Sequence, residues 1–231
     1  MLRIDLLSVV PEMLHSPLDH SIIRNARDKQ LAEIEVHNIR DYSTHKHRKV
    51  DDYPFGGGAG MVLTAQPVFD CTEALKAVRS YDEIIFMTPD APVFTQQDAN
   101  RLSLCSNLII LCGHYKGIDQ RIRDEIITKE YSIGDFVLSG GELPALVVTD
   151  AIVRLLPGVL GDAESALTDS FMDGLLDAPH YTRPAEFRGI PIPEVLRSGD
   201  HKRVQQWRQQ QMEDKTKRLR PDLYNQFLNN Q

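Results

Sequence analysis

The stretch Y-S-I-G-D-F-V-L-S-G-G-E-L-P-A-L-V-V-T-D-A-I-V-R-L-L-P-G (131–158) decides the fold class. It starts with an apolar, strand-like run (131–138), turns at Ser139-Gly140-Gly141 and continues as a helix-like segment (143–155). Pro144 suits the first turn of a helix, and Pro157-Gly158 ends it. Apolar residues recur at helical spacing at Leu143, Leu146, Val147, Ile152 and Leu155. A strand followed by a helix is the repeating unit of an α/β fold.

The same alternation recurs along the first two thirds of the chain. Further strand-like runs lie at 2–10, 33–39, 83–88 and 107–112. Helix-like segments lie at 18–30, 66–79, 95–104 and 117–127. Strands that alternate with helices predict an α/β domain around a mostly parallel sheet.

The character of the chain changes at Gly161. Residues 161–174 are small, acidic and weakly periodic, which is typical of a mobile linker. A proline-rich stretch (180–193) and two polar, helix-like segments (200–212 and 221–228) follow. We therefore predict three parts: an α/β domain at 1–160, a mobile linker at 161–174 and a small helical domain at 175–231.

Composition indicates a globular protein from a reducing compartment. Hydrophobic residues make up 42% of the chain, enough for a sizeable core. The three cysteines form no C-x-x-C pair, which argues against a disulfide scaffold. The start does not resemble a signal peptide, and the longest apolar stretch (143–160) contains Asp150 and Arg154. We expect a soluble, cytoplasmic protein.

The charge is unevenly distributed. The net charge of −7 argues mildly against nucleic-acid binding. However, residues 197–220 carry eight Lys or Arg against three acids, and residues 37–49 carry four Lys or Arg, three His and one Asp. Either stretch alone is explained as a solvated face, but two of them in an acidic chain favour an RNA-binding surface.

Three turn-rich loops follow predicted strands, at 88–90, 112–117 and 139–142. In open α/β sheets, ligands bind in the crevice beyond the carboxyl ends of the strands. Glycines in such loops allow backbone amides to approach a ligand closely. Each loop taken singly is explained as an ordinary tight turn, but three at equivalent strand ends favour one shared pocket.

Two other motifs suggest sites that their surroundings argue against. The glycines of G-G-G-A-G (56–60) fit G-x-G-x-G, but the preceding residues are polar and contain Pro54, and no G-K-[ST] follows. This segment is predicted to be a flexible loop that contacts substrate or a partner subunit. His45-Lys46-His47 lacks a third metal ligand and has cationic neighbours, so it favours a loop that faces phosphate.

Six longer motifs occur in one order along the chain: V-D-D-Y-P-F-G-G-G-A-G-M (50–61), L-C-G-H-Y-K-G-I-D-Q-R (111–121), S-I-G-D-F-V-L-S-G-G-E-L-P-A (132–145), R-L-L-P-G-V-L-G (154–161), D-S-F (169–171) and G-L-L-D-A-P-H-Y-T-R-P (174–184). With them the chain resembles the bacterial tRNA (guanine-N1)-methyltransferases, the TrmD family of SPOUT methyltransferases. The resemblance implies a trefoil-knotted, parallel-sheet SPOUT domain followed by a small helical C-terminal domain. It also implies a homodimer that binds S-adenosyl-L-methionine in the knot and methylates the guanine immediately 3′ of the tRNA anticodon.

The resemblance also implies site residues. Asp169 matches the family's general base, and Arg154 matches the arginine that stabilises the guanine oxygen. For tRNA binding we expect Lys202, Arg203 and Arg183. The adenosylmethionine pocket is expected to use Pro89, Gly113, Tyr115, Ile133, Gly134, Asp135, Phe136, Val137, Leu138, Gly140 and Gly141.

The chain departs from the family at Lys116, where members commonly have a glutamate. A role of that carboxylate in Mg²⁺ binding therefore does not transfer, and the need for Mg²⁺ stays open. Two alternative functions also stay open: a knotted methyltransferase that acts on ribosomal RNA, and a non-catalytic RNA-binding relative. The presence of both Asp169 and Arg154 argues against the second.

Overall fold

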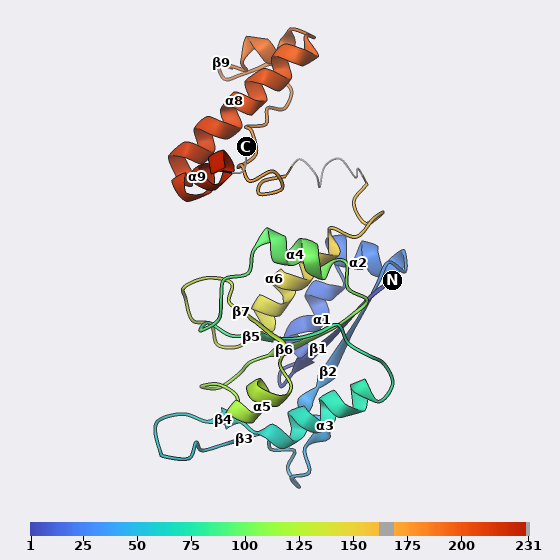
Figure 1. The fold of residues 1–231 in the computed structure, drawn as a ribbon. Helices are drawn as coiled ribbons and strands as arrows, with labels where there is room; N and C mark the ends of the chain where they lie inside the picture. The colour runs from blue at the N-terminus through green and yellow to red at the C-terminus, as the bar shows by residue number, and fades with distance from the viewer. Residues whose placement is uncertain (162–168, 230–231) are drawn as a thin grey trace. The chain divides into compact units, whose positions relative to one another are not determined.

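The computed structural model describes residues 1–161 and 169–229 (Figure 1). The chain divides into two compact units, Met1–Gly161 and Asp162–Gln231. Residues 162–168 of the predicted linker (161–174) lie outside the described residues.

A five-stranded parallel sheet forms the centre of the first unit, with strand order β2-β1-β6-β5-β7. In the middle of the sheet, Ile4 pairs with Ile34 on one side and with Leu108 on the other. The strands are β1 (Leu2–Ser8), β2 (Ala32–Asn38), β5 (Glu83–Met87), β6 (Asn107–Cys112) and β7 (Lys129–Tyr131). The predicted α/β class with a parallel sheet is confirmed.

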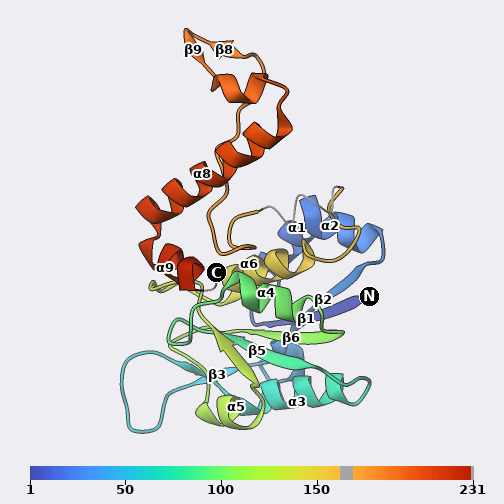
Figure 2. The same ribbon diagram turned by 45° about the horizontal axis from the view of Figure 1, so that its top comes forward.

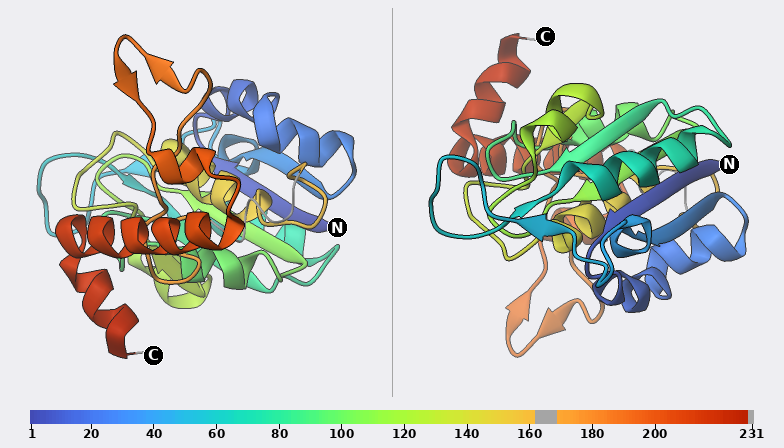
Figure 3. Two further views of the ribbon diagram at one scale, coloured as in Figure 1. Left: turned by 90° about the horizontal axis from the view of Figure 1, so that it is seen from above. Right: turned by 90° about the horizontal axis from the view of Figure 1, so that it is seen from below.

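Helices cover both faces of this sheet (Figures 1 and 3). One face carries α1 (Glu12–Leu18), α2 (Ser21–Asp28), α4 (Gln96–Leu102) and α6 (Glu142–Val153). The other face carries η1 (Ile39–Tyr42), α3 (Ala65–Lys76) and α5 (Gln120–Glu125). Along β6, Leu108 and Ile110 belong to the first core, whereas Ile109 and Leu111 belong to the second. Burial on both faces explains why this strand is a continuous apolar run.

The predicted strand at 131–138 is wrong beyond Tyr131, where β7 ends. Ser132 Oγ accepts a hydrogen bond from the amide of Gly134 and donates to its carbonyl oxygen, and Gly134 has a φ of +148°. This local turn competes with extended pairing. Three of the apolar side chains that suggested a strand, Phe136, Val137 and Leu138, are instead exposed, with Val137 80% accessible.

The predicted helix at 18–30 is observed as α2, which spans only Ser21–Asp28, and helix α1 before it was not predicted. Arg27 donates hydrogen bonds to the carbonyl oxygen of Leu18 and to Asp19 Oδ1, and thereby caps the C-terminal end of α1. Ser21 takes a φ of +53°, which separates the two helices. Both helices bury apolar residues against the same face of the sheet.

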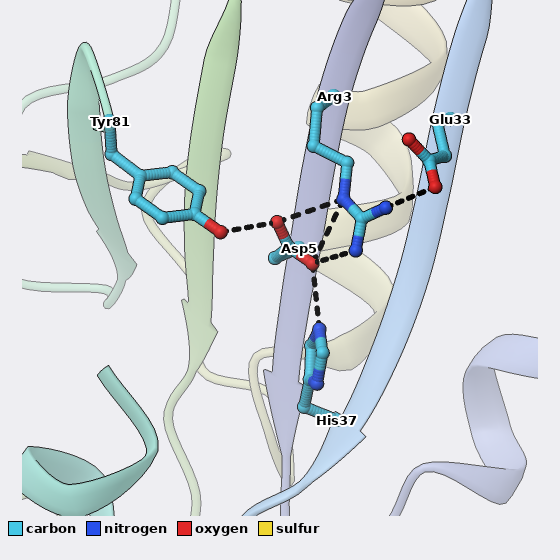
Figure 4. A network of polar contacts seen from close by, with 5 residues as sticks. All are labelled: Arg3, Asp5, Glu33, His37 and Tyr81. Carbon is cyan, nitrogen blue, oxygen red and sulfur yellow. Dashed lines mark hydrogen bonds and ion pairs between the residues drawn. The ribbon is translucent and has the colours of Figure 1, made fainter. Parts of the chain in front are cut away.

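A polar network crosses the sheet on the α3 side (Figure 4). Asp5 is fully buried and accepts hydrogen bonds from Arg3, Tyr81 and His37, at 2.7 Å from Tyr81 and from His37. Arg3 also pairs with Glu33 of the edge strand. Burial by itself would raise the pKa of Asp5, but these hydrogen bonds outweigh it and hold the pKa of this carboxyl well below its usual range.

The second unit is built on α8 (His201–Leu219), followed by α9 (Pro221–Asn229) (Figure 2). The buried hydroxyl of Thr216 in α8 donates to Met212 O and accepts from the amide of Leu176, which fixes the start of the unit on the helix. Helix α8 is longer than predicted. The short elements are β8 (Glu186–Phe187), β9 (Ile190–Pro191) and η2 (Glu194–Arg197); β8 and β9 form a hairpin that was not predicted.

A small two-stranded pair, β3 (Asp51–Asp52) and β4 (Val62–Leu63), brackets the glycine-rich loop in the first unit. In the part of the chain that the structure describes, no helix is long and apolar enough to cross a membrane.

Candidate active site

The three loops predicted to share a pocket lie around one cavity of about 480 Å³. Two of them directly follow β5 and β6, beyond whose carboxyl ends a parallel sheet binds ligands, and the third lies in the segment between β7 and α6. The lining residues from these loops are Thr88, Pro89, Asp90, Gly113, His114, Tyr115, Lys116, Gly117, Ser139, Gly140 and Gly141. The size falls in the range typical of small-molecule sites, about 300–1,000 Å³.

Three glycines allow the loops to meet. Gly141 donates from its backbone amide to Gly113 O at 2.6 Å. A Cβ on Gly141 would lie 2.6 Å from the backbone nitrogen of Gly113, and a Cβ on Gly113 would lie 2.9 Å from the Phe86 ring. A Cβ on Gly140 would lie 2.7 Å from His114 Nδ1. Any side chain at these positions would force the cavity wall apart, which is a physical reason for the glycines.

One wall of the cavity is charged. Arg123 of α5 forms ion pairs with Asp90 at 2.9 Å and with Glu130 at 2.6 Å, and its guanidinium lies 5.6 Å from the centre of the Phe86 ring. The hydrogen bonds with Glu130 raise the pKa of Arg123, and those from Thr88 and Arg123 lower the pKa of Asp90. Sequence reasoning missed Arg123 because it comes from a helix, outside the strand-end loops.

Nine of the eleven residues predicted for the adenosylmethionine pocket line this cavity. They are Pro89, Gly113, Tyr115, Ile133, Phe136, Val137, Leu138, Gly140 and Gly141. Gly134 and Asp135 belong to the same segment but are not among the described residues that line it.

Lys116 lies on the cavity wall next to the glycine-rich loop (56–60). The amide of Lys116 donates to Met61 O at 3.0 Å, and a Cβ added to Gly60 would lie 3.4 Å from the Cβ of Lys116. A Cβ added to Gly56, Gly57 or Gly58 would have no described atom within 4 Å beyond its chain neighbours. The aromatic side chains of Tyr53 and Phe55, which precede these glycines, are exposed.

The residues expected for catalysis and tRNA binding are divided between the two units. Arg154 is the C-cap of α6 in the first unit, where its amide donates to Asp150 O. Asp169 is half-buried in the second unit. Lys202 and Arg203 are exposed in the first turn of α8, and Arg183 is exposed before the hairpin.

The basic segment 45–49 is an exposed loop held by ion pairs from Arg48 to Asp41 and from Lys49 to Asp52. Among the described residues, no group of three or more His, Cys, Asp or Glu side chains could hold a metal ion.

Comparison with known proteins gives a match along nearly the whole chain. Residues 2–226 match the family model described as tRNA (Guanine-1)-methyltransferase TrmD. A tRNA (guanine-N(1)-)-methyltransferase of Chlorobaculum tepidum is 59% identical over 222 residues, which cover 96% of each protein. Proteins of the same name from Chlorobium luteolum and Bacteroides fragilis are each 58% identical over 96% of this chain, covering 96% and 99% of those proteins respectively.

Proposed function

Because the chain belongs to the tRNA (guanine-1)-methyltransferase TrmD family, we propose that it methylates N1 of the guanine immediately 3′ of the tRNA anticodon. The methyl donor is S-adenosyl-L-methionine. Family membership makes the chain a methyltransferase.

The observation that carries the proposal is the convergence on one cavity of the loops after β5 and β6 and of the segment that leads from β7 to α6. Backbone groups at Gly113, Gly140 and Gly141 can approach an adenosyl group because no Cβ intervenes. Pro89, Ile133 and Leu138 add apolar surface for the adenine ring. When bound, S-adenosyl-L-methionine supplies a methyl group on a positively charged sulfur, which is a good leaving group.

The chemical difficulty lies at the acceptor. N1 of guanine carries a proton, and its lone pair becomes available as that proton leaves. We assign Asp169 the role of the base that accepts the N1 proton. As the proton leaves, negative charge grows on O6, and the guanidinium of Arg154 is suited to stabilise it because it donates two hydrogen bonds in one plane.

The proposal includes a homodimer. Five apolar side chains are exposed in the single chain: Phe136, Val137 and Leu138, which line the cavity, and Leu143 and Val147 of α6. Contiguous exposed apolar residues are typical of protein interfaces. A second copy of the chain is the occupant that the family implies, and its binding would explain why Leu143 and Val147 of α6 follow the core periodicity and yet face outward.

Binding of tRNA is assigned to Lys202, Arg203 and Arg183 of the second unit. Their side chains are exposed, and phosphate contacts by Lys and Arg supply most of the affinity of proteins for nucleic acids. Asp200 caps α8 by accepting from the amide of Arg203, so the first turn of the helix presents Lys202 and Arg203 from a fixed backbone.

Methyl transfer from tritiated S-adenosyl-L-methionine tests the function directly. The substrates are bulk tRNA, ribosomal RNA, and tRNA transcripts with guanine or adenine immediately 3′ of the anticodon. We expect transfer only to tRNAs with that guanine. Transfer to ribosomal RNA alone would favour the alternative substrate, and binding of the donor without transfer to any RNA would favour the non-catalytic alternative.

A further inference from the structure

A buried carboxylate lies directly behind the cavity wall and has no part in the chemistry above. Glu142 is the first residue of α6 and follows Gly140 and Gly141 in the chain, yet only 1% of it is exposed. Burial of a carboxylate is costly unless it is hydrogen-bonded. Its partners therefore indicate what it does.

One oxygen of Glu142 is fixed to the sheet. Ser8 Oγ, at the end of β1, donates to Glu142 Oε1 at 2.6 Å. The same hydroxyl oxygen accepts from the amide of Val10 at 2.8 Å, so its proton is directed to Glu142. Ser8 is fully buried, and the contact joins residues 134 apart in sequence. The position of the carboxylate in the first turn of α6 adds a favourable interaction with the helix dipole.

The other oxygen faces His114. Glu142 Oε2 lies 3.9 Å from His114 Nδ1, and this nitrogen is buried without a hydrogen-bond partner among the described residues. His114 also lines the cavity. Gly140 passes beside both groups, and a Cβ there would collide with Glu142 Oε2 and lie 2.7 Å from His114 Nδ1. Only a glycine leaves space for the two side chains to approach each other.

We propose that Glu142 is a positioning residue that accepts a hydrogen bond from His114 Nδ1–H when the cavity is filled. This inference rests on the proposed function, because the occupant is an adenosyl ligand. At 3.9 Å the two atoms are too far apart for a hydrogen bond, and contacts of this kind often shorten only in the ligand complex. The hydrogen bond made by one ring nitrogen of a histidine fixes the protonation of the other. His114 Nε2 is then unprotonated and accepts from a hydroxyl or amino group of the ligand.

Glu142→Gln reverses this arrangement with little change in volume. Because Ser8 Oγ already accepts from Val10, its proton keeps the amide oxygen of the glutamine toward Ser8. The amide NH₂ then faces His114 Nδ1, which must accept, and the proton moves to Nε2. The ring therefore loses its acceptor for the ligand.

The test uses the full chain, S-adenosylhomocysteine and two measurements. Calorimetry should show binding about five- to tenfold weaker in Glu142→Gln, the loss expected for one hydrogen bond. Nitrogen NMR of labelled histidine, with the His114 signals assigned from His114→Ala, should show Nδ1–H in the wild-type complex and Nε2–H in the variant. Glu125→Gln, an exposed carboxylate of α5, is the matched control.

A double-mutant cycle separates positioning from general support of the fold. In a His114→Ala background, Glu142→Gln should cause no further loss of affinity. Ser8→Ala, which frees the carboxylate without removing it, should weaken binding in the same direction and should also have no effect without His114. Should Glu142→Gln prevent folding, Ser8→Ala carries the cycle.

The outcomes that overturn the inference are distinct from a failure of the proposed function. Wild-type protein that does not bind S-adenosylhomocysteine contradicts the function itself. Three other outcomes would overturn the role of Glu142 alone. The affinity of Glu142→Gln for S-adenosylhomocysteine could stay within twofold of that of the wild type, or the wild-type complex could show an Nε2–H signal. The loss of affinity caused by Glu142→Gln could also be equal with and without His114.

Discussion

The amide nitrogen of Gly141 lies 2.6 Å from the carbonyl oxygen of Gly113 and donates a hydrogen bond to it. This contact joins the loop after β6 to the segment that leads from β7 to α6. It leaves no space for a side chain, because a Cβ on Gly141 would also lie 2.9 Å from Cys112 Cα. The geometry of the cavity therefore depends on a backbone approach that only glycine permits.

The first prediction concerns this approach. We expect Gly141→Ala to abolish detectable binding of S-adenosylhomocysteine in calorimetry and to lower the free energy of unfolding by about 1–3 kcal/mol, the cost of overpacking. Gly161→Ala is the control, since no described atom lies within 4 Å of its added Cβ. Normal binding by Gly141→Ala would show that the loop does not form the pocket.

The second prediction concerns the proposed base. Asp169→Ala should lower kcat by about 10²–10⁴-fold, the usual contribution of a general base, while binding of S-adenosylhomocysteine is retained. Asp173→Ala removes an exposed acid from the same segment and should have little effect. A kcat within threefold of wild type for Asp169→Ala would require another base.

Sequence alone predicted those parts of the fold whose patterns are local. Strand β6 was predicted at its observed bounds because residues 108–112 are a continuous apolar run. The strand predicted after Tyr131 was wrong because Phe136, Val137 and Leu138 favour strands by residue type. Their exposure depends on tertiary contacts, which the local sequence pattern does not encode. The network around Asp5 was missed because His37 and Tyr81 lie 32 and 76 residues away in sequence.

Some residues of the candidate site could likewise be predicted from local sequence patterns, and others could not. Gly113 pointed to a pocket on physical grounds because it directly follows strand β6. Gly140 and Gly141 line the same cavity, although the strand predicted before them ends at Tyr131. Asp169 and Arg154 were assigned only through the family resemblance, because a carboxylate in an acidic segment and an arginine at a helix end have ordinary explanations. Glu142 was overlooked because, in sequence, an acid at the start of a helix is the usual helix-dipole partner.

The third prediction concerns tRNA affinity. Neutralising Lys202 and Arg203 to glutamine should weaken tRNA binding. The slope of log K against log salt concentration should fall by about 1 for each phosphate that the variant no longer neutralises. The pair Lys76→Gln and Lys129→Gln removes the same charge from exposed positions of the first unit. Equal slopes for the test pair and wild type would assign this part of α8 to a solvated face.

The fourth prediction concerns stability in acid. The pKa of Asp5 is depressed in the folded protein, so its ionised form stabilises the fold above the unfolded-state pKa of about 4. This stability is lost as the pH falls through the lower, folded-state pKa. Asp5→Asn should cost about 3 kcal/mol at pH 7, with a difference from wild type that shrinks below about pH 4. Denaturant titrations from pH 2 to 7 measure it, and a constant difference across that range would contradict the role of the charge.

The last prediction concerns Lys116, which lies on the cavity wall with its stem against Gly60. A protonated lysine cannot bind Mg²⁺, but its three donors suit a phosphate or the carboxylate of the methyl donor. We therefore expect Lys116 to supply a fixed positive charge where the family resemblance implies a glutamate that would recruit a cation. With tRNA folded beforehand, the initial rate should depend weakly on Mg²⁺ in the wild type and strongly in Lys116→Glu. Lys76→Glu reverses an exposed charge on α3 and should leave the curve unchanged. Superimposable Mg²⁺ titrations for wild type and Lys116→Glu would mean that Lys116 points into solvent and that any metal requirement arises elsewhere.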